Sequence, residues 1–298
     1  MKATWKSFVV VAALLAAAVQ AASAQTPALA ALERQHVLLG TTGACNNEFP
    51  GGPCTQTSTL FRINPTTGAV INEIGPVGFT VNGLAWDARS GTLYASTAIG
   101  DVVFHGLITI DPFTGAGTPV NPAAINFGLA GADSPIHSIA IDPFGQMVGW
   151  YDEFPPPVGV TDTFVRINKH TGVATEFPDT GLDSHQNGLA FQTFGIFSVL
   201  WNIDGLVVPK GTPTAPATQT AYVINPFTGK ILTSRPISPP MMAALGDFNP
   251  VNLHYYGLEF QAFGPPTTFI NVIDPVRGTA RRLAQTVDGL HVLAFVKR

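Results

Sequence analysis

The hydrophobic positions of this 298-residue chain fall in short runs, and within several runs apolar and polar side chains alternate. Between Leu107 and Asp111, for example, Ile108 and Ile110 alternate with Thr109. A period of two is the pattern of a pleated strand with one buried face. Gly, Pro, Asn and Asp gather between the runs, as they do in tight turns. The chain is therefore predicted to be all-β, with many short strands.

The runs recur in a fixed order, and one turn motif marks each recurrence. RINPTTGAV returns as TIDPFTGAG, RINKHTGVA, VINPFTGKI and VIDPVRGTA, with the aligned glycines at Gly68, Gly115, Gly172, Gly229 and Gly278. The period is roughly 50 residues, within the range of repeat architectures. A second run follows each motif, as VNGLAWD, IHSIAID, QNGLAFQ, MAALGDF and VDGLHVLAF. These copies indicate five equivalent units.

A third run, with copies TLYAST, MVGWYD, SVLWNID and LHYYGLEF, is missing after the last repeat and occurs instead as HVLLGTT from His36. Four-stranded units repeated around an axis form a β-propeller. We expect a single five-bladed propeller whose first blade takes its inner strand from Leu290 to Val296. The other three strands of that blade come from residues 36–73, which closes the ring. Six or seven blades would require further, degenerate repeats.

These repeats resemble those of secreted bacterial propellers of the YVTN/NHL-like type, and of domains of unknown function with I-D-P-x-T-G repeats. The resemblance covers nearly the whole chain after residue 35. It implies the propeller fold but no particular activity, because propellers carry many unrelated functions.

The N-terminus has the pattern of a secretory signal peptide. Lys2 and Lys6 precede an apolar run from Val9 to Val19, and small residues precede Gln25. We expect residues 1–24 to be the signal peptide, 25–35 a flexible segment and 36–298 the propeller domain. The alternative is an uncleaved N-terminal anchor. Cleavage would give a secreted or periplasmic bacterial protein without a membrane span, expected to be a monomer.

The chain has few charged residues, and acidic residues outnumber basic ones. Charged residues make up 11% of the chain, against about 25% in average soluble proteins, and the formal net charge is −4. No basic patch is present, which argues against nucleic acid as a partner. The sequence also lacks G-x-S-x-G, HExxH and phosphate-loop motifs, so no catalytic residue is assigned.

The two cysteines, Cys45 and Cys54, flank one Gly- and Pro-rich loop. Export implies an oxidising compartment, where such a pair forms a disulfide. On the chain-entropy model the bond stabilises the loop by about 3 kcal/mol. The alternative, a metal-binding pair, lacks further ligands nearby.

The position of the repeated motif distinguishes the two faces of the predicted propeller. It joins the third strand of each blade to the fourth, and the turns between strands one and two lie at the same end. All these turns are short, so we call this the tight-turn face. The connections at the other end, the loop-rich face, are longer and unlike one another. Function concentrates on variable loops held by a rigid scaffold, so we expect the site on the loop-rich face.

Polar residues lie where the inner strands begin, around the central channel at the loop-rich face. The predicted ligand-binding ring is Asn82, His137, His185, Asn187 and Asp288. Asn and Asp oxygens suit Ca²⁺, and His suits a transition metal. The ring resembles that of calcium-dependent lactonase propellers, but it lacks a matching Glu, and its fourth position offers only Met242 or Ala243. The alternative is a structural role in shaping the turns into the strands.

The function predicted from the sequence is a secreted binding module for a small molecule, a glycan or a protein, without a cofactor. The alternative is a channel-mouth hydrolase or lyase acting on a sugar or lactone, assisted by a divalent cation such as Ca²⁺. A third hypothesis is a structural component that docks through Phe113, Phe144 and Phe227 in the tight turns. Each of these rings can instead fold back on its own blade.

Overall fold

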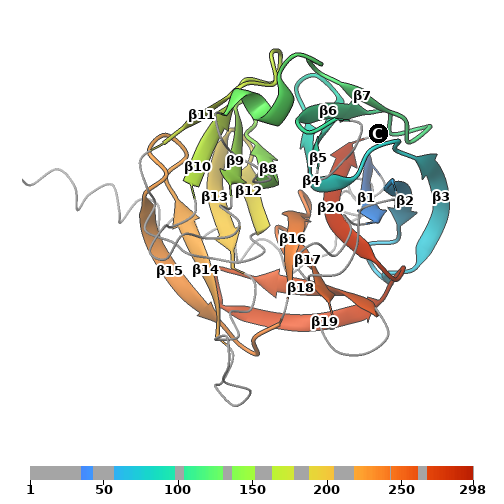
Figure 1. Ribbon diagram of the computed structural model, residues 1–298. Coiled ribbons are helices and arrows are strands. Elements are labelled where there is room, and N and C mark those ends of the chain that lie inside the picture. The colour runs from blue at the N-terminus through green and yellow to red at the C-terminus, as the bar shows by residue number, and fades with distance from the viewer. Residues whose placement is uncertain are drawn as a thin grey trace, which may run out of the picture.

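The chain is an all-β, five-bladed propeller, as the repeats predict (Figure 1). The computed structural model describes residues 35–42, 57–97, 104–129, 136–151, 163–177, 188–204, 218–241, 243–260 and 267–297. Within these ranges the strands form five antiparallel sheets of four strands each. The sheets stand around a central channel, and one edge strand of each sheet, called the inner strand, lies beside the channel (Figure 1).

The four strands of every blade succeed one another from the channel outward. Blade 1 contains β20 (Leu290–Lys297), β1 (His36–Thr42), β2 (Thr59–Ile63) and β3 (Val70–Pro76). Blade 2 contains β4 (Val81–Asp87), β5 (Thr92–Thr97), β6 (Leu107–Ile110) and β7 (Gly117–Pro119). Blade 3 contains β8 (Ile136–Ile141), β9 (Met147–Tyr151), β10 (Thr163–Ile167) and β11 (Ala174–Glu176). Blade 4 contains β12 (Gly188–Phe194), β13 (Phe197–Ile203), β14 (Gln219–Ile224) and β15 (Ile231–Ile237). Blade 5 contains β16 (Ala243–Phe248), β17 (Tyr255–Phe260), β18 (Thr268–Asp274) and β19 (Thr279–Gln285).

The two ends of the described chain close the ring inside blade 1. β20 pairs antiparallel with β1 from His36 opposite Lys297 to Thr42 opposite Leu290. β20 also contacts the inner strands of the two neighbouring blades, β4 and β16. The predicted closure by N- and C-terminal strands is therefore confirmed.

The hydrophobic core is divided among the five interfaces between neighbouring blades. Each buried apolar cluster joins two adjacent blades, and the cluster between blades 1 and 2 also includes Leu245 of blade 5. In the cluster between blades 3 and 4, for example, the fully buried Trp150 and Phe164 pack with Leu189. Outer strands such as β3 and β15 are mostly exposed. Because no blade has a core of its own, stability depends on the intact ring.

The repeated motif is a tight turn that satisfies its own backbone. Asn64 Oδ1 accepts a hydrogen bond from Thr66 N–H at 2.8 Å, and Asn64 C=O accepts one from Gly68 N–H at 2.8 Å. Gly68 has φ +70°, which a side chain would disfavour. The equivalent glycines, Gly115, Gly172, Gly229 and Gly278, have φ between +69° and +83°. The motif is therefore architectural.

Blade 3 departs from the motif by carrying Lys169 where the other turns have proline. The Lys169 ammonium pairs with the fully buried carboxylate of Asp87 at the end of β4. Lys169 thus links the outer turn of blade 3 to the inner strand of blade 2. This contact explains why a side chain with a donor replaces proline at this turn.

Some predictions fall on residues outside the described ranges. These are the signal peptide, nearly all of segment 25–35, and the pair Cys45 and Cys54. Within the part of the chain that the structure describes, no helix has the length and apolarity of a membrane span.

Candidate functional site

The five inner strands run in the same direction around the channel, because each begins its blade at the loop-rich face. They contact one another in the cyclic order β4, β8, β12, β16 and β20. Equivalent positions in different blades therefore lie at the same depth along the channel. Polar side chains at the same position of several inner strands therefore form a ring around the channel.

Three inner strands carry a β-bulge near their first ladder position. In β4 the register shifts between Val81 and Gly83, which leaves Asn82 as the extra residue. The extra residue of β8 is His137, and that of β20 is His291. Bulges re-aim side chains and are over-represented next to functional sites. The three polar residues thus occupy equivalent positions at the loop-rich end of the channel, and we call them the mouth ring.

The observed register places His291, and not Asp288, at the position equivalent to Asn82. The sequence comparison aligned VDGL with VNGL, which set Asp288 against Asn82. In the structure Asp288 lies in the exposed turn before β20. The signal that identifies His291 is the triplet that follows two residues later, Leu-Ala-Phe in β20 and Leu-Ala-Trp in β4. Because Asn82 and His291 are the extra residues of equivalent bulges, the copy of VNGLAW in blade 1 begins at Leu290 and not at Val287.

The other predicted members of the ring lie outside the described residues. Asn187 directly precedes β12, at the position equivalent to Asn82 in the repeat, and His185 lies two residues earlier. Asn82 is buried and His137 half-buried. A ligand-binding role for the ring stays a prediction.

The mouth ring contains at least one neutral imidazole. Burial lowers the pKa of His291 to about 4, so this side chain carries no charge at neutral pH. A neutral imidazole donates one hydrogen bond and accepts another. With the Asn82 amide, the ring therefore offers both donors and acceptors. In the described ranges, no three His, Cys, Asp or Glu side chains lie close enough together to hold a metal ion. The calcium alternative also stays a prediction.

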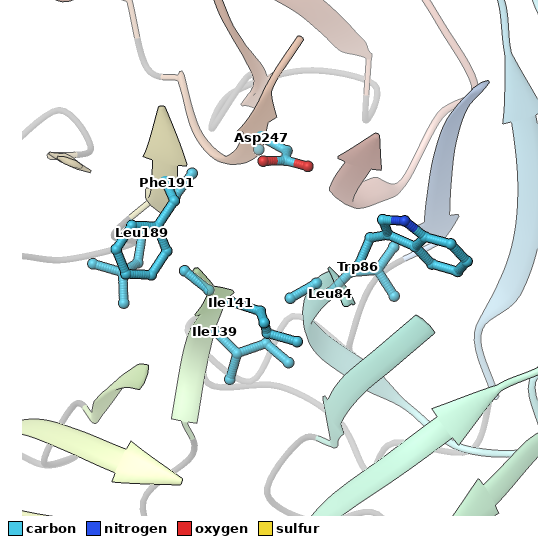
Figure 2. A pocket seen from close by; sticks show the side chains of 11 residues that line it. Leu84, Trp86, Ile139, Ile141, Leu189, Phe191 and Asp247 are labelled. Atoms are coloured by element: carbon cyan, nitrogen blue, oxygen red, sulfur yellow. The ribbon is translucent and has the colours of Figure 1, made fainter. Parts of the chain in front are cut away.

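Deeper in the channel, toward the tight-turn face, the inner strands enclose a pocket (Figure 2). Residues of β4, β8, β12 and β16 line it, and Asp247 of β16 is the one ionisable residue among them. The lining is formed by Leu84, Ala85, Trp86, Ile139, Ala140, Ile141, Leu189, Ala190, Phe191, Gly246 and Asp247. The cavity volume is about 30 Å³, which is room for about two water molecules and far below the roughly 300 Å³ of small-molecule pockets.

Asp247 interrupts a ring of alanines. Its equivalents in the other inner strands are Ala85, Ala140, Ala190 and Ala294. Asp247 Oδ1 accepts a hydrogen bond from the Phe248 N–H, and Oδ2 accepts one from the Phe295 N–H, both at 2.8 Å. The second bond joins blade 5 to blade 1. The sequence alignment missed this site because it began the copy at Met242, whereas the register makes Ala243 the equivalent of Val81.

The bulge of β16 lies between Ala244 and Asp247, directly before Asp247. Leu245 takes φ +45° there, a left-handed conformation that costs about 1–2 kcal/mol for a residue with a side chain. Strained backbone of this kind clusters at functional sites. The bulge sets Asp247 at the rim of the pocket, where its carboxylate faces the side chains of the other three strands (Figure 2).

Burial raises the pKa of Asp247 to about 7, although the N–H groups of Phe295 and Phe248 favour its charged form. The native state therefore holds a proton that the unfolded chain releases near pH 4, so Asp247 lowers stability as pH rises from 4 to 7. Burial lowers the pKa of His291, so this residue makes the protein more stable as pH rises toward 6.5, the opposite of the effect of Asp247. The two effects overlap, so only a comparison with a variant isolates Asp247.

We expect Asp247→Asn to become more stable relative to the unchanged protein as pH rises from 5 to 8. The gain in the free energy of unfolding is at most about 4 kcal/mol. The observed gain should be smaller, because the carboxyl group faces the channel. Urea denaturation at several pH values measures the difference. Asp288→Asn, which removes one exposed carboxylate, is the matched control. Parallel stability curves for Asp247→Asn and the unchanged protein would contradict the raised pKa.

The tight-turn face carries exposed aromatic rings. Phe113 is 88% exposed, and Phe144 and Phe227 are each 63% exposed. The expectation that these rings fold back onto their own blades is therefore wrong. The turn between β12 and β13 adds Ile196 and Phe197, also exposed. The rings lie on separate turns of blades 2, 3 and 4.

No protein-family model matches the chain, and no curated protein matches its sequence. Among solved structures, a Bacteroides thetaiotaomicron protein of unknown function is 13% identical, with a TM-score of 0.46, covering 85% of this chain and 65% of its own. TolB from Acinetobacter baumannii is 9% identical, with a TM-score of 0.45 and coverages of 88% and 67%. The Dos1 propeller is 11% identical, with a TM-score of 0.37 and coverages of 77% and 53%. The chain thus spans about half to two thirds of the length of these structures, and the similarities say nothing about its activity.

Proposed function

We propose that the protein is a binding module that takes a small molecule, a glycan or a protein at the loop-rich mouth of its channel. The observation that supports this proposal is the mouth ring, in which Asn82, His137 and His291 occupy the same bulge position. Export to the periplasm or the cell exterior, a monomeric state and the YVTN/NHL-like repeat type belong to the same proposal.

A binding role fits the chemistry of the ring better than catalysis. Amide and neutral imidazole groups recognise hydroxyl and amide groups by hydrogen bonds. Hydrolysis of a glycoside requires a pair of carboxyl groups in most enzymes, and the described mouth ring contains none. The channel-mouth hydrolase or lyase therefore stays the alternative. Sugars present many hydroxyl groups, so a glycan suits the donors and acceptors of the ring.

A thermal-shift experiment tests this function with calcium chloride and a panel of mono- and disaccharides. A compound that binds only the folded protein at 100 times its Kd stabilises it by about 2.7 kcal/mol, which raises Tm by roughly 5–10 °C. We expect His137→Ala to abolish the shift caused by a compound that binds the unchanged protein. His170→Ala, in an exposed turn of the tight-turn face, should retain it.

Two results would contradict the proposal. The first is a panel in which no compound changes Tm. The second is a shift of equal size in the unchanged protein and in His137→Ala. Product formation from a sugar or lactone would favour the enzyme alternative.

A further inference from the structure

The exposed Phe side chains of the described residues all lie on the tight-turn face, each in a turn or directly beside one. They are Phe113 and Phe227 in the repeated motif, Phe144 between β8 and β9, and Phe197 beside the turn between β12 and β13. A single exposed apolar side chain is ordinary, but one Phe buries roughly 150–250 Å² when it is covered. This face therefore gains free energy wherever an apolar phase approaches it.

The turns hold three of these rings outward on a backbone that is already hydrogen-bonded. The N–H group of each Phe donates to the Asp or Asn Oδ1 two positions earlier, at 2.8–2.9 Å: Phe113 to Asp111, Phe144 to Asp142, and Phe227 to Asn225. Arg89 Nη1 also donates to the Phe144 carbonyl oxygen at 3.1 Å. A backbone group that has a partner is less costly to remove from water than an unpaired one. The tips of these turns can therefore enter an apolar phase.

Polar positions separate the rings, which lie on turns of blades 2, 3 and 4. In the repeated turn, the position of Phe113 and Phe227 is occupied by His170 in blade 3 and by Thr66 in blade 1, both exposed. A protein partner usually covers an apolar centre inside a polar rim. A lipid surface instead accepts apolar side chains one by one, because fluid lipid adjusts around each of them. The spacing of the rings thus favours lipid over protein as the partner.

The exposed charges of this face are suited to anionic lipid headgroups. Among the described residues, those exposed in the tight turns or at the strand ends beside them are mostly basic. They are the basic residues Arg89, Lys230, Arg277 and Lys297 and the acidic residue Asp111. Lys and Arg side chains near a membrane are attracted to anionic lipids. The face is therefore positive, although the formal net charge of the chain is −4.

The chain also enters the fold at this face. The first residue of β1, His36, lies opposite Lys297 at the tight-turn end of β20. The apolar run from Val9 to Val19 precedes His36 in the sequence. If that run enters a membrane, as the export prediction requires, the segment that follows it leads directly to the tight-turn face.

We propose that the tight-turn face docks on the surface of a lipid bilayer with anionic headgroups. In this arrangement Phe113, Phe144 and Phe227 insert at the boundary between headgroups and acyl chains, and the basic residues contact the headgroups. The mouth ring would then face away from the membrane. The inference goes beyond the proposed binding function and does not depend on it.

Co-sedimentation with vesicles tests the proposal. The vesicles contain phosphatidylcholine with phosphatidylglycerol as a minority lipid, and vesicles of phosphatidylcholine alone keep the apolar phase without the charge. The protein used begins at Gln25, because the run from Val9 to Val19 would itself bind lipid, and all five blades lie after that residue. We expect the protein to sediment with the anionic vesicles and to bind the uncharged ones about threefold more weakly.

Serine substitutions measure the contribution of the rings. The triple variant Phe113→Ser, Phe144→Ser and Phe227→Ser should lose at least about tenfold in vesicle binding. The matched control His170→Ser, at the same turn position in blade 3, should bind like the unchanged protein. Thr66→Phe adds a ring at that position in blade 1 and should strengthen binding about threefold. All these positions are exposed, so each variant should keep its Tm, which heat denaturation checks.

Three results would overturn the proposal. The first is an unchanged protein that does not sediment with the anionic vesicles, and the second is equal binding by the triple variant. The third is a dimer that forms without lipid and is lost in the triple variant, because the rings would then contact a second copy of the chain. The mouth ring is tested separately. His137→Ala should bind vesicles normally, and saccharide binding that persists in the triple variant would show that the proposed function stands if the lipid contact fails.

Discussion

A chain that ends before β20 should be unfolded throughout, and not merely missing part of one blade. The β20 strand supplies Val292, Ala294 and Val296 to the core between blades 1 and 2. It supplies Leu290, Leu293 and Phe295 to the core between blades 5 and 1. Burying a large apolar side chain contributes about 1.5–3 kcal/mol, so the five larger ones together contribute about 8–15 kcal/mol. A whole domain is stable by only about 5–15 kcal/mol.

Circular dichroism and heat denaturation of a chain lacking residues 290–298 measure this effect. We expect loss of the cooperative melting transition and of the near-ultraviolet signal of the buried aromatic side chains. The matched control is Lys297→Ala, at the exposed end of β20, which should melt like the unchanged protein. A milder variant, Phe295→Ala, should lose about 3–5 kcal/mol. If the truncated chain kept a cooperative transition, closure of the ring through β20 would be wrong.

The same closing strand explains why the fold was predictable from sequence. A strand that is absent from the last repeat and present at the other terminus has one simple geometric explanation, a ring closed inside one blade. The turn motif was equally readable, because Asn64, Pro65 and Gly68 have backbone preferences that do not depend on distant contacts. The glycine φ values confirm it. Local chemistry and repetition together determine this architecture.

The channel was less predictable, because its features depend on register. One extra residue in an inner strand changes which side chain faces the channel. The mouth position of blade 1 was assigned to Asp288 instead of His291 because the copy was started at Val287 and not at Leu290. Asp247 was missed because the copy in blade 5 was started at Met242, one residue before the equivalent of Val81. The correct start is visible only once each inner strand is paired with its neighbour.

The two ends of the channel differ in the chemistry they offer. At the loop-rich end, the mouth ring presents amide and imidazole groups. Toward the tight-turn face, the Asp247 carboxylate interrupts the ring of alanines at the pocket. Both sites arise from bulges in inner strands, while the regular parts of the same strands form the inter-blade core. Departures from the repeat therefore mark the positions where function is expected.

Gly246→Ala should destabilise the protein strongly, by more than about 3 kcal/mol, because β16 approaches β17 too closely for a side chain there. A Cβ atom at Gly246 would lie 1.8 Å from the Tyr256 carbonyl oxygen and 2.8 Å from the Gly257 Cα. Both contacts are with backbone of the paired strand, which cannot move without breaking its hydrogen bonds. Inserting atoms into a well-packed site costs about 1–3 kcal/mol when side chains can adjust, and at Gly246 they cannot.

Gly195→Ala is the matched control for this substitution, because Gly195 has φ +63° and nothing within 4 Å of an added Cβ. Its cost should be limited to about 1–2 kcal/mol for the left-handed conformation. Urea denaturation of both variants measures the loss of stability in each. The comparison distinguishes the steric clash at Gly246 from the backbone strain at Gly195. Equal destabilisation by the two substitutions would show that β16 can relax away from β17, and that the close approach does not hold Asp247 at the pocket.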